Sequence, residues 1–192
     1  MRRPARIAAL LLALAAGLAA AATQWAVVPD ESRIVFGYEA DGAPVEGVFT
    51  RFSGEGTFDP AAPGDATLEL RIDSASIELG DARASAFATS AEWFDSANHP
   101  HVVYRLLGLT PLENTPLAGT SYRAEGELSI RGRARPVSTT VELAIGAEVA
   151  RASGTLVIDR KDYGLGVGPM ALFVDIGRDV AVRFELVARA AR

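Results

Sequence analysis

From Trp25 onward, hydrophobic and polar residues alternate along most of the chain with a period of two. The alternation is clearest in five segments: residues 33–38, 66–73, 122–131, 137–145 and 180–187. Strict alternation is typical of antiparallel strands that bury one face and expose the other to solvent. The pattern therefore predicts an all-β protein whose strands share one hydrophobic face.

Turn-forming residues separate the predicted strands at short intervals. Pro, Gly and Asp gather in residues 28–31, 41–44, 59–64, 131–136 and 164–169. About seven to nine strands with brief connections favour a β-sandwich or β-barrel over a fold of alternating strands and helices. No linker or long repeat interrupts the pattern, so we expect residues 23–192 to form one domain.

One segment departs from the strand pattern. Residues 81–90 are rich in alanine and poor in β-branched residues, and Pro100 follows shortly afterwards. Ser90, with Glu92 two residues later, resembles the start of a helix with Ser90 as the N-cap. The sequence therefore predicts one or two short helices between residues 81 and 98.

The first 22 residues have the layout of a secretory signal peptide. Arg2, Arg3 and Arg6 form a basic start, residues 7–18 are almost wholly apolar, and four alanines end the segment at Ala22. We expect cleavage after Ala22 and export of the remaining chain. An uncleaved membrane anchor is the alternative, although the apolar stretch is short for a bilayer span of about 20 residues.

Composition removes several classes of function. Of the 192 residues, none is cysteine, which excludes disulfides, thiolate metal sites, cysteine nucleophiles and a lipid-modified N-terminal cysteine. The net charge of −5 argues against nucleic acid as a partner. Because 49% of the residues are hydrophobic, the chain has the apolar content of a folded globular protein.

The hydrophobic face of the predicted strands is rich in aromatic and aliphatic side chains. We expect ten of them to point inward: Phe36, Tyr38, Phe49, Phe58, Leu70, Tyr104, Leu128, Val141, Leu156 and Phe184. They could fill a solid core, or they could line a lumen, because an eight-stranded barrel can pack shut or hold one small ligand. The periodicity alone does not choose between these two arrangements.

Residues suited to catalysis or metal binding are few. His99 and His101 are the two histidines, and with Asp95 they could bind Zn²⁺ or Cu²⁺, but the same residues also suit a simple corner before a strand. No G-x-S-x-G elbow is present, and Gly164–Gly168 lacks the Lys-Ser/Thr of a phosphate loop. We therefore expect neither an enzyme nor a metal or cofactor site.

One basic cluster lies in a predicted hairpin turn and consists of Arg131, Arg133 and Arg135. Such a run is usually a solvated turn. If it lay at the mouth of a barrel, the same arginines could meet anionic lipid headgroups.

Eight segments, taken in order, resemble the YceI-like family of secreted bacterial proteins, which are known as polyisoprenoid-binding and lipocalin-like. One of them, Gly47-Val-Phe-Thr-Arg-Phe-Ser-Gly54, matches a G-x-F-x-x-F-x-G strand. The others are residues 25–36, 56–60, 72–77, 92–100, 126–137, 159–166 and 180–186. The resemblance covers nearly all of residues 24–190.

The resemblance implies an eight-stranded, antiparallel, lipocalin-like β-barrel with a hydrophobic tunnel for an isoprenoid or other long-chain lipid. It adds Phe94 to the ten inward residues as part of the tunnel lining. It further implies a periplasmic protein that carries or sequesters lipid, with the bacterial membrane as donor or acceptor and a possible link to b-type cytochromes. The alternative is a structural or stress-response interaction module with a solid core.

Overall fold

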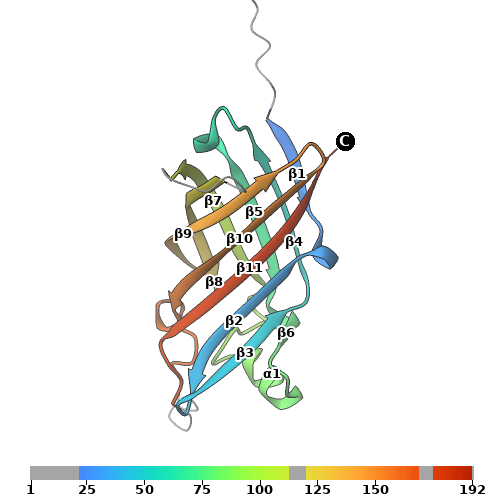
Figure 1. Ribbon diagram of the computed structural model, residues 1–192. Coiled ribbons are helices and arrows are strands. Elements are labelled where there is room, and N and C mark those ends of the chain that lie inside the picture. The colour runs from blue at the N-terminus through green and yellow to red at the C-terminus, as the bar shows by residue number, and fades with distance from the viewer. Residues whose placement is uncertain (1–21, 113–119, 169–174, 192) are drawn as a thin grey trace, which may run out of the picture.

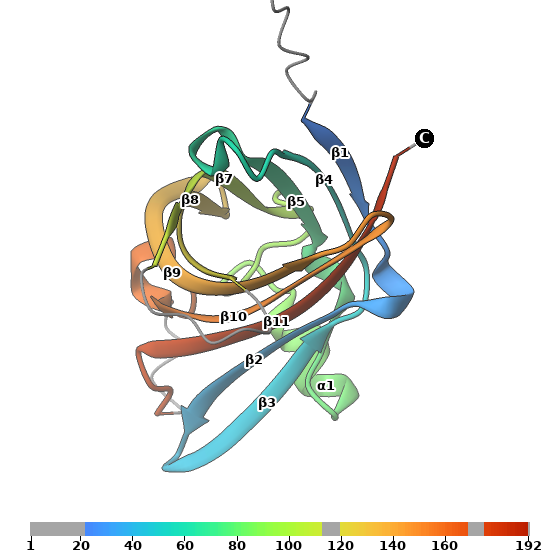
Figure 2. The same cartoon turned by 45° about the horizontal axis from the view of Figure 1, so that its top comes forward.

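The computed structural model describes residues 22–112, 120–168 and 175–191. Its strands form one antiparallel sheet that closes on itself, which confirms the predicted all-β class and the lipocalin-like barrel (Figures 1 and 2). The predicted signal peptide lies outside the described residues except for Ala22. Within the described ranges, no helix has the length and hydropathy to cross a lipid bilayer.

The strands in chain order are β1 (Thr23–Val27), β2 (Arg33–Ala40), β3 (Ala43–Phe49), β4 (Phe52–Phe58), β5 (Thr67–Asp73), β6 (Ile77–Glu78), β7 (His101–Pro111), β8 (Thr120–Ile130), β9 (Arg133–Ile145), β10 (Val149–Asp159) and β11 (Asp179–Ala190). Their hydrogen-bonded order is β1-β4-β5-β7-β8-β9-β10-β11-β2-β3-β6. A further pairing between β1 and β11 closes the barrel.

The described part of the chain has eleven strands but eight positions around the barrel, because three positions are each occupied by two short strands in succession. The first shared position holds β1 and β2, which both pair with β11. The second holds β4, which pairs with β1, and β3, which pairs with β2. The third holds β5, which pairs with β4, and β6, which pairs with β3. Each pair is therefore one bent strand. The ring is an up-and-down arrangement in which neighbours in sequence are neighbours in space.

The bend between β1 and β2 has a clear local cause. Pro29 has no backbone N–H and begins a 3-10 turn, Pro29–Glu31, that interrupts the strand. The Ser32 hydroxyl donates to the carbonyl oxygen of Val28 at 2.7 Å and accepts from the backbone N–H of Val187 at 2.9 Å. The side chain of Ser32 thus replaces the hydrogen bonds that the sheet loses at the bend.

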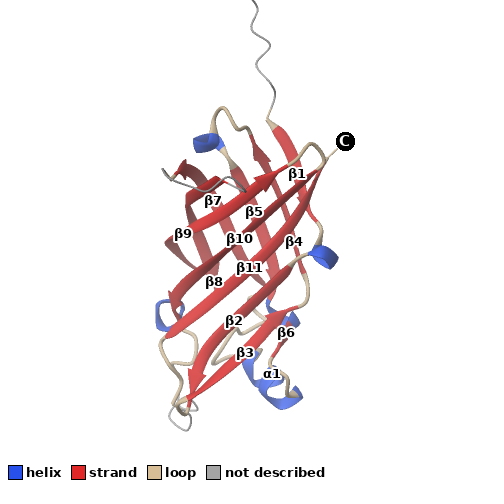
Figure 3. Cartoon of the chain, in the orientation of Figure 1, coloured by secondary structure: helices blue, strands red, loops and turns tan. Residues whose placement is uncertain are grey.

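One α-helix, α1 (Ala82–Ala88), lies within the range where one or two helices were predicted, beside β6 and β3 (Figure 3). Its N-cap is Asp81, whose carboxylate accepts from the backbone N–H groups of Arg83 and Ala84 at 2.9 Å. The prediction that Ser90 begins a helix is wrong. Residues 91–98 form turns, and Asp95 has a φ of +48°, which no α-helix tolerates.

The interior contains two hydrophobic clusters, one toward each end of the barrel. At the end near α1, here called the helix end, the cluster includes Phe36, Phe49 and Tyr163. At the end where the chain termini meet, here called the termini end, it includes Trp25, Phe58 and Tyr122. Ala152 and Phe184 contact both clusters, so the apolar interior runs continuously between the two ends.

Candidate functional site

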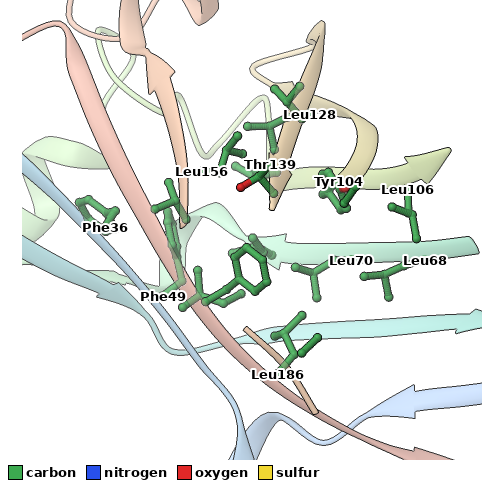
Figure 4. A pocket seen from close by; sticks show the side chains of 18 of the residues that line it. Phe36, Phe49, Leu68, Leu70, Tyr104, Leu106, Leu128, Thr139, Leu156 and Leu186 are labelled. Atoms are coloured by element: carbon green, nitrogen blue, oxygen red, sulfur yellow. The ribbon is translucent and has the colours of Figure 1, made fainter. Parts of the chain in front are cut away.

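The barrel encloses a cavity of about 280 Å³ lined by the inward faces of its strands (Figure 4). The lining extends from Trp25 at the termini end to Trp93 at the helix end. Ligand sites in proteins commonly measure about 300–1,000 Å³, so this volume lies just below that range. The interior is therefore hollow, a point that periodicity had left open.

All eleven residues predicted to line a tunnel border this cavity: Phe36, Tyr38, Phe49, Phe58, Leu70, Phe94, Tyr104, Leu128, Val141, Leu156 and Phe184. Ten of them lie on strands and point inward by the alternation of the strand, whereas Phe94 lies in the turns that follow α1. The structure thus brings the predicted residues together around one space. Their contact with a lipid remains a prediction.

Several other lining residues were not singled out from the sequence. Ile34, Leu68 and Leu186 follow the same alternation as their neighbours, and that signal could have identified them. Leu79, Trp93 and Leu165 lie outside the long strands, in segments that turn across the helix end. No periodic pattern marks such residues, because their direction depends on the path of the turn.

Aromatic side chains gather at the helix end of the cavity. The ring centroids of Phe36 and Phe49 are 5.3 Å apart, and those of Phe49 and Phe94 are 5.7 Å apart in an edge-to-face arrangement. Such spacings are favourable for aromatic pairs. The rings give this end of the cavity a wall of large, rigid apolar groups.

Arg160 is the one charged residue among the described residues that line the cavity. It is 5% exposed, and its guanidinium lies 5.5 Å from the ring centroid of Trp93. It donates hydrogen bonds of 2.7–2.9 Å to four backbone carbonyl oxygens, those of Leu165, Gly166, Ile176 and Gly177. Burial lowers the pKa of Arg160. Because four of its five N–H donors are engaged, the guanidinium holds two turns of the helix end together and is not available to the cavity as a free cation.

The turn beside Arg160 depends on glycine. Gly164 and Gly166 have φ values of +71° and +60°, as expected from the glycine-rich sequence. A Cβ atom on Gly166 would lie 2.6 Å from the ring of Trp93 and 2.9 Å from a guanidinium nitrogen of Arg160. The absence of a side chain therefore lets Arg160 and Trp93 pack against the turn.

The histidines lie outside the cavity lining. The Nε2 atom of His99 is 3.8 Å from a carboxylate oxygen of Asp95, and His101 opens β7 in register with Asp73. In the described ranges, no group of three or more His, Cys, Asp or Glu side chains is arranged to hold a metal ion. The geometry of these residues therefore suggests a corner before a strand.

The basic cluster lies at the helix end, but only Arg131 lies in the turn between β8 and β9, because Arg133 and Arg135 belong to the start of β9. Arg131 donates to the carbonyl oxygens of Gly164 at 2.5 Å and Ala91 at 2.9 Å, so its side chain ties this turn to its neighbours. Arg133 and Arg135 are exposed. Arg131 is therefore structural, and two arginines remain exposed to solvent.

Two curated relatives share moderate sequence similarity with this chain. A UPF0312 protein of Vibrio cholerae is 24% identical over 139 residues, covering 69% of this chain and 70% of the relative. A UPF0312 protein of Pseudomonas fluorescens is 24% identical over 140 residues, covering 69% and 71%.

Solved structures share the barrel. BcnA of Burkholderia cenocepacia superimposes with a TM-score of 0.74 at 26% identity, covering 84% of this chain and 98% of that one. A polyisoprenoid binding domain of Saccharophagus degradans, implicated in plant cell wall breakdown, superimposes with a TM-score of 0.69 at 18% identity, covering 87% and 98%.

A family model described as a YceI-like domain matches residues 25–188, which is almost the whole described barrel. The match spans both ends of the barrel, from Trp25 in β1 to β11. It agrees with the closed antiparallel sheet, the apolar cavity and the similar solved barrels. The chain belongs to the YceI-like domain family.

Proposed function

We propose that this protein binds an isoprenoid-type or other long-chain lipid inside the barrel. The observation that carries the proposal is the apolar cavity between the two hydrophobic clusters, in which the one charged lining residue already donates to four carbonyls. An apolar lumen favours an elongated apolar guest. The similar Saccharophagus degradans domain is described as polyisoprenoid binding, which supports this class of ligand.

The hydrophobic effect is sufficient for such binding without a charged contact. Transfer of each methylene from water into an apolar site contributes about 0.8 kcal/mol, so ten methylenes contribute about 8 kcal/mol. Immobilising the lipid and the side chains offsets part of this gain. Micromolar affinity corresponds to about 8 kcal/mol, so a longer chain brings it within reach.

Carriage or sequestration of the lipid in the periplasm completes the proposal. The signal-peptide pattern of residues 1–22 supports export, and the bacterial membrane would then be the natural donor or acceptor of a lipid. A link to membrane b-type cytochromes rests on the family resemblance alone. We propose no covalent reaction on the bound molecule.

The test is extraction of the freshly purified protein with organic solvent, followed by mass spectrometry. We expect a lipid near one molecule per protein. In Ala152→Phe, a ring would occupy the region where Ala152 contacts both hydrophobic clusters, and the variant should lose the lipid while still folding. Ala144→Phe is the matched control, because Ala144 is exposed on β9 and should retain the lipid.

An empty wild-type protein that also fails to take up added long-chain lipids would contradict the proposal. That result would favour the alternative of a structural or stress-response interaction module. Equal lipid content in the Ala152→Phe and Ala144→Phe variants would place the lipid outside the barrel and would also contradict it.

A further inference from the structure

Four of the polar side chains that border the cavity already have hydrogen-bond partners within the protein. The hydroxyls of Thr57 and Thr67 hydrogen-bond to each other at 2.8 Å, and the Thr139 hydroxyl donates to the carbonyl oxygen of Thr155 at 2.6 Å. Arg160 is bound to four carbonyls, as described above. Four other lining side chains have a donor with no hydrogen bond to any described residue: the indole N–H groups of Trp25 and Trp93, toward the two ends of the cavity, and the hydroxyls of Tyr38 and Tyr104. Of these four groups, the two hydroxyls can also accept a hydrogen bond, and the tyrosines are considered next.

Tyr104 is the deeper of these two tyrosines. It lies on β7 in register with Leu70 on one side and Leu128 on the other, and both leucines belong to the buried core. Tyr38 lies near the end of β2, in register with Val45, two residue pairs from the turn that joins β2 to β3. Burial raises the pKa of Tyr38 and raises that of Tyr104 to about 12, consistent with the greater depth of Tyr104.

The position of the Tyr104 ring is set by a glycine on the neighbouring strand. A Cβ atom on Gly126 would lie 2.6 Å from both the hydroxyl oxygen and a ring carbon of Tyr104. The ring therefore packs against the backbone of Gly126 on β8, in space that the side chain of any other residue at position 126 would occupy. This packing holds the hydroxyl at a defined place beside the cavity (Figure 4).

We propose that the Tyr104 hydroxyl donates a hydrogen bond to an uncharged oxygen acceptor on the bound lipid, such as a ketone, ester or amide carbonyl, and so selects lipids with a neutral polar group. The proposal rests on the proposed function, because it concerns a lipid in the same cavity. It adds a specificity-determining residue and the chemical class of the group that this residue recognises.

The surroundings of Tyr104 disfavour a charged acceptor. Burial of an anion requires a nearby cation or several donors, and Arg160 has only one of its five N–H groups uncommitted. A carbonyl oxygen needs only one donor, which the phenol supplies. With a pKa of about 12, the phenol remains protonated at physiological pH and retains its hydrogen for donation.

The experiment compares three probes of equal chain length: an isoprenoid methyl ketone, the hydrocarbon in which a methylene replaces the carbonyl, and the corresponding carboxylate. Affinities are measured for the wild type, Tyr104→Phe and Tyr163→Phe. Tyr163 is a buried tyrosine outside the cavity lining and serves as the matched control. We expect Tyr104→Phe to bind the ketone about fivefold more weakly, the effect of one hydrogen bond, and to bind the hydrocarbon unchanged. Tyr163→Phe should change neither.

Infrared spectroscopy of the bound ketone provides a second measurement that needs no affinity. A hydrogen bond lowers the carbonyl stretching frequency. We therefore expect a lower frequency in the wild type and in Tyr163→Phe than in Tyr104→Phe, in which the hydrogen bond is absent. A wild-type band at the frequency of a carbonyl in hydrocarbon solvent would overturn the inference, whatever the stability of the variants.

The outcomes separate the inference from the proposed function. If the hydrocarbon binds but Tyr104→Phe leaves ketone affinity unchanged, the inference is overturned and lipid binding stands. Carboxylate binding as tight as ketone binding would overturn the selection of neutral groups. If none of the three probes binds, the proposed function fails and the inference fails with it.

Discussion

At the scale of single residues, Arg160 shows how a buried charge can be held without a carboxylate partner. Four backbone carbonyls and the face of Trp93 surround the guanidinium. The planar group has five N–H donors in a fixed fork, which suits several carbonyls that approach from different turns. Arg160 therefore joins three segments distant from one another: the turns after α1, the glycine-rich turn and the approach to β11.

Arg160→Lys tests this role. Lysine keeps the charge but places it at one point and offers three donors, so at least one buried carbonyl loses its partner. We expect the free energy of unfolding to fall by about 2 kcal/mol, measured by urea denaturation. Arg178→Lys is the matched control, because Arg178 is an exposed residue paired with Asp159, and it should lower the free energy of unfolding much less than Arg160→Lys does. Equal losses in the two variants would contradict the role assigned to Arg160.

At the scale of elements, bends divide three of the eight barrel positions into two strands each. β1 and β2 remain one continuous wall because β11 pairs with both of them across the bend. Ser32 supports this arrangement by bonding to Val28 on one side and to Val187 on the other. A single hydroxyl thus links the end of one short strand to the neighbouring long one.

Ser32→Ala should therefore weaken the barrel at the bend. Loss of the hydroxyl leaves the N–H of Val187 without this acceptor, and we expect the free energy of unfolding to fall by about 1–2 kcal/mol. Ser138→Ala, at an exposed position on β9, should change it by less than about 0.5 kcal/mol. Hydrogen exchange of the Val187 amide provides a local readout, and unchanged protection in Ser32→Ala would contradict the assignment.

At the scale of the whole molecule, tyrosines whose pKa is raised by burial make stability depend on alkaline pH, and Tyr104 and Tyr163 have the largest shifts. Burial raises the pKa of Tyr104 and of Tyr163 to about 12 in the folded protein, against about 10 in an unfolded chain. Above pH 10 the unfolded state loses these protons first, so it is favoured as the pH rises. The stability that is fully present below pH 10 should therefore decline between pH 10 and pH 12.

Urea denaturation at pH 8, 10 and 11 measures this decline. Tyr104→Phe removes one of these groups, so the loss of stability between pH 10 and 11 should be smaller in this variant than in the wild type. An identical decline in both proteins would show that Tyr104 does not titrate differently in the folded and unfolded states.

Much of this molecule follows from the sequence alone. The alternation of hydrophobic and polar residues decided the all-β class and the inward direction of residues such as Phe36, Leu70 and Leu128, because adjacent side chains in a strand point to opposite faces. The alanine-rich composition of residues 81–90 located the helix. The expected helix start at Ser90 was wrong because serine is a good N-cap wherever it lies, and only the path of the following turns, with Asp95 at a φ of +48°, shows that no helix follows it.

Only the tertiary structure decided whether the barrel is hollow or has a solid core. Whether facing walls meet or leave a cavity depends on the number and tilt of strands in the ring, and these depend on pairings such as β1 with β11, between residues far apart in sequence. The roles of Arg160 and Tyr104 likewise depend on contacts between residues far apart in sequence. The partners of Arg160 are the carbonyls of separate turns, and the available space at Tyr104 comes from a glycine on another strand, so neither leaves a local pattern in the sequence.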